Sequence, residues 1–194
     1  MDGTVGNGTL IVVLGPSGSG KDTVIDYART ALGERAEVMF VRRVVTRDAA
    51  AAAEDHDTLT EAEFAAQERA GAFAFTWNAH GLSYGWPRAL DAHLQAGGVA
   101  IANGSRATLK RLEQKYRGLL PVALSVRADI LAGRIAARGR ESAAEITARL
   151  ERGERFTVDA PGVVTIDNNG RPEAAGRAFL VCVESRLAAL GATA

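Results

Sequence analysis

Short apolar segments alternate with amphipathic segments along most of this chain. The apolar segments are rich in Val, Ile and Leu and have the length of buried strands, whereas the segments between them repeat apolar residues at helical spacing. The predicted strands are residues 9–14, 38–41, 99–102, 119–126 and 163–166. The predicted helices are residues 21–32, 105–116, 130–137, 143–156 and 172–190. This alternation predicts an α/β fold with a mostly parallel, doubly wound sheet and helices on both of its faces.

Residues 42–90 interrupt this alternation. They contain an arginine pair, a run of alanines at 49–53, a predicted helix at 60–70 and a strand-like segment at 72–77. Thr60 and Glu63 have the spacing of a capping box, which favours a helix start there. The alanine run is predicted to be a loop, with a short helix as the alternative. We interpret the stretch as an acceptor-binding lobe inserted into a single domain, whose core comprises residues 9–41 and 98–190.

The length and charge of the chain limit the functions that it can have. The chain has 194 residues and a formal net charge of zero, with 47% hydrophobic residues. That length is enough for one domain with a full hydrophobic core. A neutral chain has no overall field that attracts nucleic acid or an anionic membrane, so we expect neither as a partner. The oligomeric state is left open.

The sequence also predicts a cytoplasmic protein. No apolar run approaches the roughly 18 residues that would indicate a membrane span. The first eight residues are Gly-rich and polar, without the basic end or the apolar stretch of a signal peptide. The single cysteine, Cys182, lies in an apolar run and is predicted to be a buried structural thiol, which fits a reducing compartment.

The segment between the first predicted strand and the first predicted helix is typical of a phosphate-binding loop. Its glycines allow positive φ and let backbone N–H groups surround phosphate oxygens, and the helix N-terminus adds partial positive charge. Lys21 is placed to reach the β- and γ-phosphates of ATP. The alternative is a Gly-rich turn without a ligand. The predicted ATP-binding residues of this segment are Gly15, Pro16, Ser17, Gly18, Ser19, Gly20, Lys21 and Asp22.

Asp22 occupies the place where phosphate loops usually have Ser or Thr. The usual hydroxyl binds Mg²⁺, and a carboxylate is also a good Mg²⁺ ligand, directly or through a water. The predicted strand that ends near Asn103 is followed by no acidic residue that could orient the metal. We therefore predict Mg²⁺ as cofactor and Asp22 as its ligand. The alternative is that Asp22 is only a first-turn acid that the helix dipole favours.

Arginines and one tyrosine are candidates for binding a phosphorylated acceptor. Guanidinium groups bind phosphate in a bidentate manner, and a phenol can donate a hydrogen bond to it. The alternatives are that these arginines pair with acids such as Glu54 and Asp55, and that the tyrosine only packs. The tyrosine is predicted to lie in a tight turn over residues 80–85. The predicted acceptor-binding residues are Arg42, Arg43, Arg47, Tyr84 and Arg106.

A further arginine cluster lies at residues 134–150. Arg138 and Arg149 are about three helical turns apart and flank a predicted loop. Arginines in such a place can close over a transferring phosphoryl group and stabilise the charge of the transition state. We predict that both are catalytic together with Lys21, and that Arg134 contacts ATP. The alternative is a solvated helix face.

Together these motifs resemble the guanylate-kinase-like branch of P-loop kinases, and within it the ribose 1,5-bisphosphate phosphokinases of phosphonate metabolism. The resemblance covers nearly the whole chain. It rests on residues 15–22, 42–47, 54–56, 77–85, 103–106 and 138–150. It implies that ATP phosphorylates ribose 1,5-bisphosphate to 5-phosphoribosyl 1-diphosphate (PRPP) with release of ADP. It also implies that residues 134–150 form an Arg-rich lid. With Asp22 after its lysine, the phosphate loop is similar to the form that this family uses.

Guanylate kinases are the nearest alternative, but the residues that would recognise guanine differ. The place of their base-binding glutamate is Phe75, their next acid is replaced by Asn103 and its neighbours, and the Ser or Thr after their Tyr-Gly is Trp86. An aromatic ring cannot replace those polar partners of the base. The sequence therefore favours a small sugar-phosphate acceptor. A guanylate or other nucleoside monophosphate kinase and a non-catalytic binding module remain the alternatives.

Overall fold

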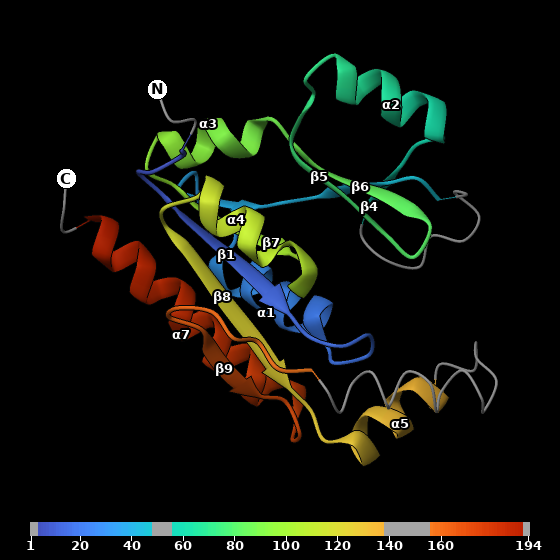
Figure 1. Ribbon diagram of the computed structural model, residues 1–194. Coiled ribbons are helices and arrows are strands. Elements are labelled where there is room, and N and C mark those ends of the chain that lie inside the picture. The colour runs from blue at the N-terminus through green and yellow to red at the C-terminus, as the bar shows by residue number, and fades with distance from the viewer. Residues whose placement is uncertain (1–3, 48–55, 138–155, 192–194) are drawn as a thin grey trace.

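The computed structural model describes residues 4–47, 56–137 and 156–191, and its main feature is a five-stranded parallel sheet (Figure 1). The strands lie in the order β2-β7-β1-β8-β9, and every neighbouring pair is parallel. Their bounds are β1 (Thr9–Leu14), β2 (Val38–Phe40), β7 (Val99–Asn103), β8 (Leu119–Ser125) and β9 (Val164–Asp167). Each agrees with a predicted strand to within one residue at either end. The α/β fold that the sequence predicts is thus confirmed.

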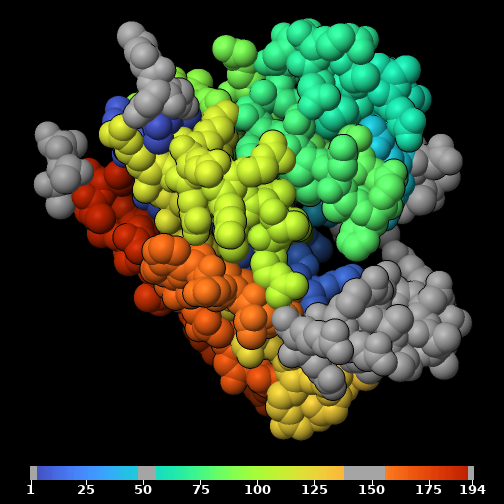
Figure 2. Space-filling view, in the orientation of Figure 1, coloured from blue at the N-terminus to red at the C-terminus, as the bar shows by residue number. Residues whose placement is uncertain are grey.

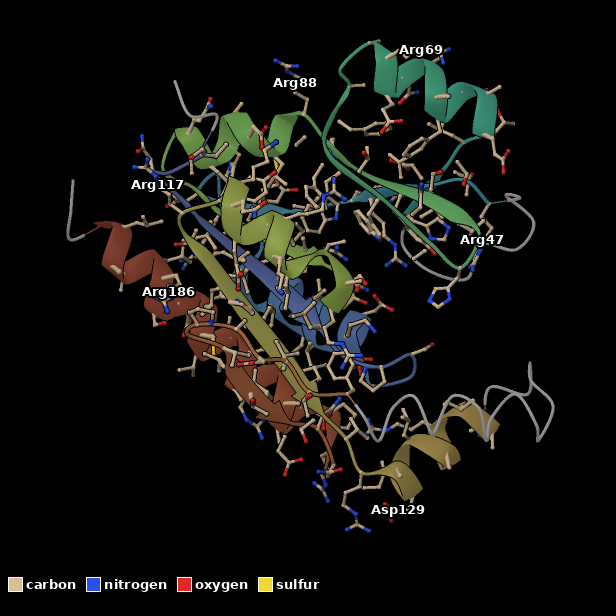
Figure 3. The ribbon with its side chains drawn as sticks, viewed as in Figure 1. Arg47, Arg69, Arg88, Arg117, Asp129 and Arg186 are labelled. Carbon is tan, nitrogen blue, oxygen red and sulfur yellow. The ribbon has the colours of Figure 1, made fainter. Side chains whose placement is uncertain are left out.

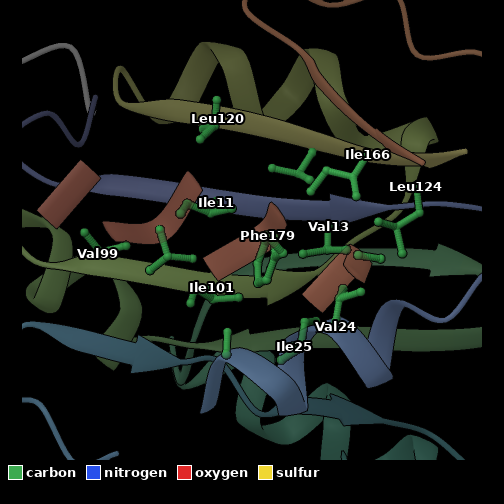
Figure 4. Packing of buried hydrophobic residues seen from close by; sticks show 14 of the residues in the cluster. Ile11, Val13, Val24, Ile25, Val99, Ile101, Leu120, Leu124, Ile166 and Phe179 are labelled. Carbon is green, nitrogen blue, oxygen red and sulfur yellow. The ribbon is translucent and has the colours of Figure 1, made fainter. Parts of the chain in front are cut away.

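Helices cover both faces of this sheet. They are α1 (Lys21–Leu32), α3 (Ala89–Gln95), α4 (Leu109–Lys115) and α7 (Pro172–Gly191). Helix α5 (Ala128–Ala137) instead lies beyond the carboxyl end of β8, with Leu131 and Ile135 beside Gly18 (Figure 1). On one face Ile11 and Val13 of β1 pack with Val24 of α1 and Phe179 of α7 in a single buried cluster (Figure 4). Cys182, also in α7, is only half-buried, and burial raises the pKa of its thiol.

The opposite face of β1 is buried just as completely. Leu10, Val12 and Leu14 are fully buried there and belong to a second cluster with residues of α3 and α4. Because both faces of a covered parallel strand are apolar, β1 appears in the sequence as an uninterrupted hydrophobic run. This burial holds the carboxyl end of β1 in place, and the loop that follows β1 starts from there.

A second, mixed sheet contributes aromatic side chains to that second cluster. Its strands lie in the order β4-β3-β6-β5, with β3 and β4 parallel and the other pairs antiparallel. Their bounds are β3 (Arg43–Val45), β4 (His56–Thr58), β5 (Phe73–Ala79) and β6 (Leu82–Pro87). Helix α2 (Glu61–Arg69) has the predicted capping box between Thr60 and Glu63. Of this sheet only β5 was predicted as a strand.

Two expectations for local structure need correction, and a third lies almost wholly outside the described residues. Tyr84 does not lie in a turn, because the turn consists of His80 and Gly81, with φ of 54° and 73°, and Tyr84 follows in β6. Residues 105–116 are not one helix: Ser105 is extended, the short 3₁₀ helix η2 (Arg106–Thr108) follows, and α4 comes after it. The predicted helix 143–156 lies outside the described residues except for Phe156, which is not helical.

Within the described residues, none of the helices combines the length and the apolar character that a membrane span requires.

Candidate active site

The loop from β1 to α1 lies at the carboxyl edge of the main sheet, where open α/β sheets bind their ligands. Gly18 and Gly20 have φ of 88° and 89°, which side chains other than glycine rarely adopt. A Cβ on Gly15 would lie 2.3 Å from Ser19 Oγ, and one on Gly20 would lie 2.6 Å from Asn168 Nδ2. The glycines of this loop are therefore required by its conformation and by its close packing.

Lys21 lies at the first position of α1 with its side chain folded back on the loop. Its Nζ donates hydrogen bonds to Gly15 O at 3.0 Å and to Pro16 O at 3.1 Å. The N-terminus of α1 has no side-chain cap, since Gly20 occupies the N-cap position. Uncapped N–H groups and the ammonium together form a positive region suited to phosphate oxygens.

Asp22 is exposed in the first turn of α1 and contacts the end of β7. Asn103 Nδ2 donates a hydrogen bond to Asp22 Oδ1 at 2.8 Å. Gly104 N donates to Val13 O at 3.1 Å, which keeps the end of β7 beside β1. The pair presents hard oxygen atoms of the kind that Mg²⁺ prefers, so the residues present fit such an ion. Among the described residues no group of three or more His, Cys, Asp or Glu side chains could hold a metal by itself.

Asn168, which follows β9, holds the phosphate loop through its side chain, and sequence reasoning did not predict this role. Its Nδ2 donates to Ser19 O at 2.7 Å, and its backbone N donates to Ser125 O at 2.9 Å. Arg134 of α5 donates through Nη2 to Asn168 O at 2.9 Å, so this predicted ATP-binding residue lies close to the loop. The available sequence signal was that Asn168 follows a predicted strand at the ligand-binding edge.

The two neighbouring arginines of the second sheet lie on opposite faces. Arg43 and Val45 point to the same face of β3, and Val45 pairs with Tyr84, so Arg43 and Tyr84 share a face. Arg42 instead donates through Nε to Asp57 Oδ1 at 2.6 Å on the exposed side. The acid that pairs with it is thus Asp57, whereas the alternative partners Glu54 and Asp55 lie outside the described residues.

The face that carries Tyr84 also holds an aromatic cluster. Tyr84 stacks on Trp77 with centroids 5.2 Å apart, and Trp86 lies 5.3 Å from Trp77 and 5.6 Å from Phe75. Phe75 and Trp86 are only 6% and 0% exposed. Aromatic side chains therefore fill the inner side of the sheet beyond Tyr84.

The remaining predicted residues are dispersed. Arg47 is exposed at the end of the second sheet, just beyond β3 (Figure 3). Arg106 donates through Nη1 to Thr157 O at 3.1 Å and lies over the ring of Phe156 at 5.0 Å. It therefore lies against the segment that precedes β9. The predicted lid residues Arg138 and Arg149 lie outside the described residues.

Figure 2 shows a hollow beside the second sheet, and blue residues of the N-terminal part lie at its floor. The carboxyl end of β1 and the phosphate loop occupy this region in the ribbon (Figure 1). The predicted ATP-binding loop and the second sheet thus border the same hollow.

Solved structures with the same fold include kinases. A guanylate kinase from Anaplasma phagocytophilum has a TM-score of 0.63 at 15% identity, over 94% of this chain and 86% of that one. A sugar kinase from Janibacter sp. HTCC2649 has a TM-score of 0.53 at 21% identity, over 94% and 98% of the two chains. At these identities the likeness concerns the fold alone.

Curated proteins give a much stronger likeness, although no family model matches the chain. The chain is 45% identical to "Ribose 1,5-bisphosphate phosphokinase PhnN" of Chelativorans sp. (strain BNC1), over 89% of this chain and 83% of the relative. Proteins of the same name from Brucella melitensis and Agrobacterium fabrum are 47% and 46% identical, with 90% and 93% of their lengths covered. The conserved length and these identities show that the chain belongs to the ribose 1,5-bisphosphate phosphokinase family.

Proposed function

We propose that the chain transfers the γ-phosphoryl group of ATP to ribose 1,5-bisphosphate and so forms PRPP and ADP. The observation that carries the proposal is the identity of 41–47% to several relatives of that name, over about nine-tenths of the chain. In this reaction an oxygen of the acceptor's 1-phosphate forms a bond to the γ-phosphorus, and the bond between that phosphorus and the β,γ-bridging oxygen breaks. ADP leaves with that oxygen.

The acceptor needs no general base. A phosphate monoester has a second pKa of about 6, so its attacking oxygen is already ionised near neutral pH. The obstacle is instead the repulsion between two anions and their loose placement. Lys21 and the loop N–H groups counter that repulsion at the donor. Arg134, Arg138 and Arg149 complete the proposed positive surroundings of the transferring group.

For the acceptor we assign the main contacts to Arg43 and Tyr84. The two side chains share the face of the second sheet that carries the aromatic cluster, and this sheet borders the same hollow as the phosphate loop. Arg42 would first have to release Asp57, so its contribution is smaller. Arg47, beyond β3, and Arg106, beyond β7, complete the proposed set.

Mg²⁺ is the proposed cofactor, and Asp22 the residue that would hold it. When bound with ATP, Mg²⁺ neutralises phosphate charge. Asn103 fixes one carboxylate oxygen of Asp22 and so leaves the other to face the ion. A cytoplasmic site of action, in phosphonate metabolism or in another supply of PRPP, follows as part of the same proposal.

A nucleotide acceptor is disfavoured by the aromatic cluster. By its sequence resemblance, Phe75 stands in place of the glutamate with which guanylate kinases hold their base, and its ring packs against Trp86 and Trp77. Buried rings offer neither space nor hydrogen-bond acceptors to a purine. A ribose bisphosphate has no base and needs neither.

The decisive measurement is coupled ADP release with purified protein, Mg²⁺ and ATP, comparing ribose 1,5-bisphosphate with GMP at equal concentrations. We expect a much larger kcat/KM for ribose 1,5-bisphosphate, with PRPP identified as product. Faster turnover of GMP would overturn the proposal in favour of a guanylate kinase. ATP binding without turnover of any acceptor would favour a non-catalytic module.

A further inference from the structure

Asn168 connects the end of β9, an edge strand of the main sheet, to the phosphate loop. It is 3% exposed, and its side-chain amide donates to Ser19 O at 2.7 Å. Its own backbone is fixed on both sides, by Ser125 O and by Arg134 Nη2, at 2.9 Å each. The amide therefore has little freedom to reorient.

The bond to Ser19 O fixes the orientation of one peptide group in the loop. In a planar trans peptide the C=O and N–H groups point in opposite directions. With the Ser19 carbonyl bonded to Asn168, the N–H of Gly20 is directed away from Asn168. Gly20 begins α1 as its N-cap, where backbone N–H groups face bound phosphate.

Two further observations indicate that the site requires the N–H donor of the Asn168 side chain. Asn168 Oδ1 is buried and has no hydrogen-bond partner among the described residues. A buried polar atom without a partner is costly, so an apolar residue would be favoured if only packing mattered. In addition, Asn168 Nδ2 lies so close to Gly20 that any Cβ there would collide with it at 2.6 Å.

We propose that Asn168 is a positioning residue for the phosphate loop: it holds the Ser19–Gly20 peptide so that the Gly20 N–H faces the phosphates of the bound nucleotide. The proposal rests on the proposed use of ATP. Asn168 acts on the ligand only through the loop and does not touch it.

A competing role for Asn168 is direct contact with the base of ATP through Oδ1. The two roles differ in how they affect a ligand that has phosphates but no base. Loss of loop order weakens binding of ATP and of inorganic tripolyphosphate alike. Loss of a base contact weakens binding of ATP only.

The test uses Asn168→Ala and Asn168→Leu, which removes the donor at nearly unchanged side-chain size and adds no charge. Asn169→Ala is the matched control, because the Asn169 side chain bonds to Arg127 N and to Asp167 rather than to the loop. Binding of Mg-ATP and of tripolyphosphate is measured by calorimetry, with amide hydrogen exchange over residues 15–22. We expect both Asn168 variants to bind either ligand about tenfold more weakly, as for one lost ordering hydrogen bond. Exchange in the loop should accelerate, and Asn169→Ala should match the parent.

Unchanged tripolyphosphate binding in the Asn168 variants would overturn the proposal, whether or not ATP binding falls. If Asn168→Ala fails to fold, Asn168→Leu keeps the side-chain size without adding a charge and decides the question. Failure of the parent protein to bind ATP would instead refute the proposed function, so the two failures are distinguishable.

Discussion

At the residue scale, the ammonium of Lys21 has carbonyl partners that a phosphate can outcompete. Neutral carbonyls bind an ammonium less strongly than phosphate oxygens do, so ATP is expected to draw the Lys21 side chain away from Gly15 O and Pro16 O. We expect Lys21→Ala to lower kcat by about 10²- to 10³-fold, as for other groups that stabilise transition-state charge. Steady-state ADP release measures the effect. Lys110→Ala removes an exposed lysine and should leave turnover unchanged, and near-normal turnover of Lys21→Ala would contradict the role.

Because Asn103 and Asp22 are hydrogen-bonded to each other, a pair of substitutions can move the carboxylate from position 22 to position 103. We expect Asp22→Asn to raise the Mg²⁺ concentration needed for half-maximal ATP binding by about tenfold, because the ion loses its charged ligand. Adding Asn103→Asp to that variant restores a carboxylate at the same place and should recover much of the loss. Titration of fluorescent ATP binding with Mg²⁺ measures both effects. An Mg²⁺ dependence that Asp22→Asn leaves unchanged would exclude Asp22 as ligand.

Some of the site residues could be predicted from the sequence, and others could not. The phosphate loop could, because its glycines and Lys21 lie within one short segment and their roles depend on local conformation. The role of Asn168 could not, because it depends on pairing of β8 with β9 that brings Asn168 to Ser19. Which of Arg42 and Arg43 shares a face with Tyr84 also required the observed register of the second sheet, since a shift by one residue moves a side chain to the opposite face.

At the element scale, the apolar character of each strand decided whether it could be predicted. The strands of the main sheet lie in apolar runs of the sequence, which located all five of them, including the three-residue β2. Strand β3 begins with Arg43, β4 (His56–Thr58) has no apolar residue, and β6 contains Gly85 and Pro87, which usually indicate loops. Their pairing is decided by tertiary contacts such as those of Trp86.

Packing between α1 and α7 depends on a glycine. A Cβ on Gly176 of α7 would lie 2.4 Å from the ring of Tyr27 in α1, whereas one on Gly133 of α5 would meet nothing within 4 Å. We expect Gly176→Ala to destabilise the protein by about 1–3 kcal/mol through overpacking, despite the better helix propensity of alanine. Gly133→Ala should stabilise by up to about 1 kcal/mol. Urea unfolding measures both, and a more stable Gly176→Ala variant would show that the helices can separate at little cost.

At the scale of the whole molecule, a polar network joins the second sheet to the helices over the main sheet. Lys115 Nζ of α4 donates to Ala74 O of β5 and, at 2.8 Å, to Asp91 Oδ2 of α3. Tyr116 OH donates to Asp91 Oδ1 at 2.9 Å and is 2% exposed. The second sheet, which bears Arg43, is therefore fixed to the core by hydrogen bonds as well as by aromatic packing, which favours a preformed acceptor site.

This network predicts how the protein unfolds in alkali. Burial raises the pKa of Tyr116 far above its ordinary value, and the Asp91 carboxylate raises it further. Since the folded pKa lies above the unfolded value of about 10, the contribution of Tyr116 is fully present below pH 10 and is lost as the pH rises beyond it. Tyr116→Phe loses the bond to Asp91, so at pH 8 we expect it to be less stable by about 1 kcal/mol.

Above pH 10 the difference in the free energy of unfolding between the parent and Tyr116→Phe should shrink by up to about 1.4 kcal/mol per pH unit. The reason is that only the parent has a phenol at position 116 that ionises in the unfolded chain and must be protonated again on folding. Urea unfolding between pH 8 and pH 11 gives both free energies. Tyr27→Phe, at a half-buried tyrosine of α1, is the control and should follow the parent through this range. A constant difference between Tyr116→Phe and the parent would mean that Tyr116 ionises as readily in the folded protein as in the unfolded chain, so that the network does not keep its phenol protonated.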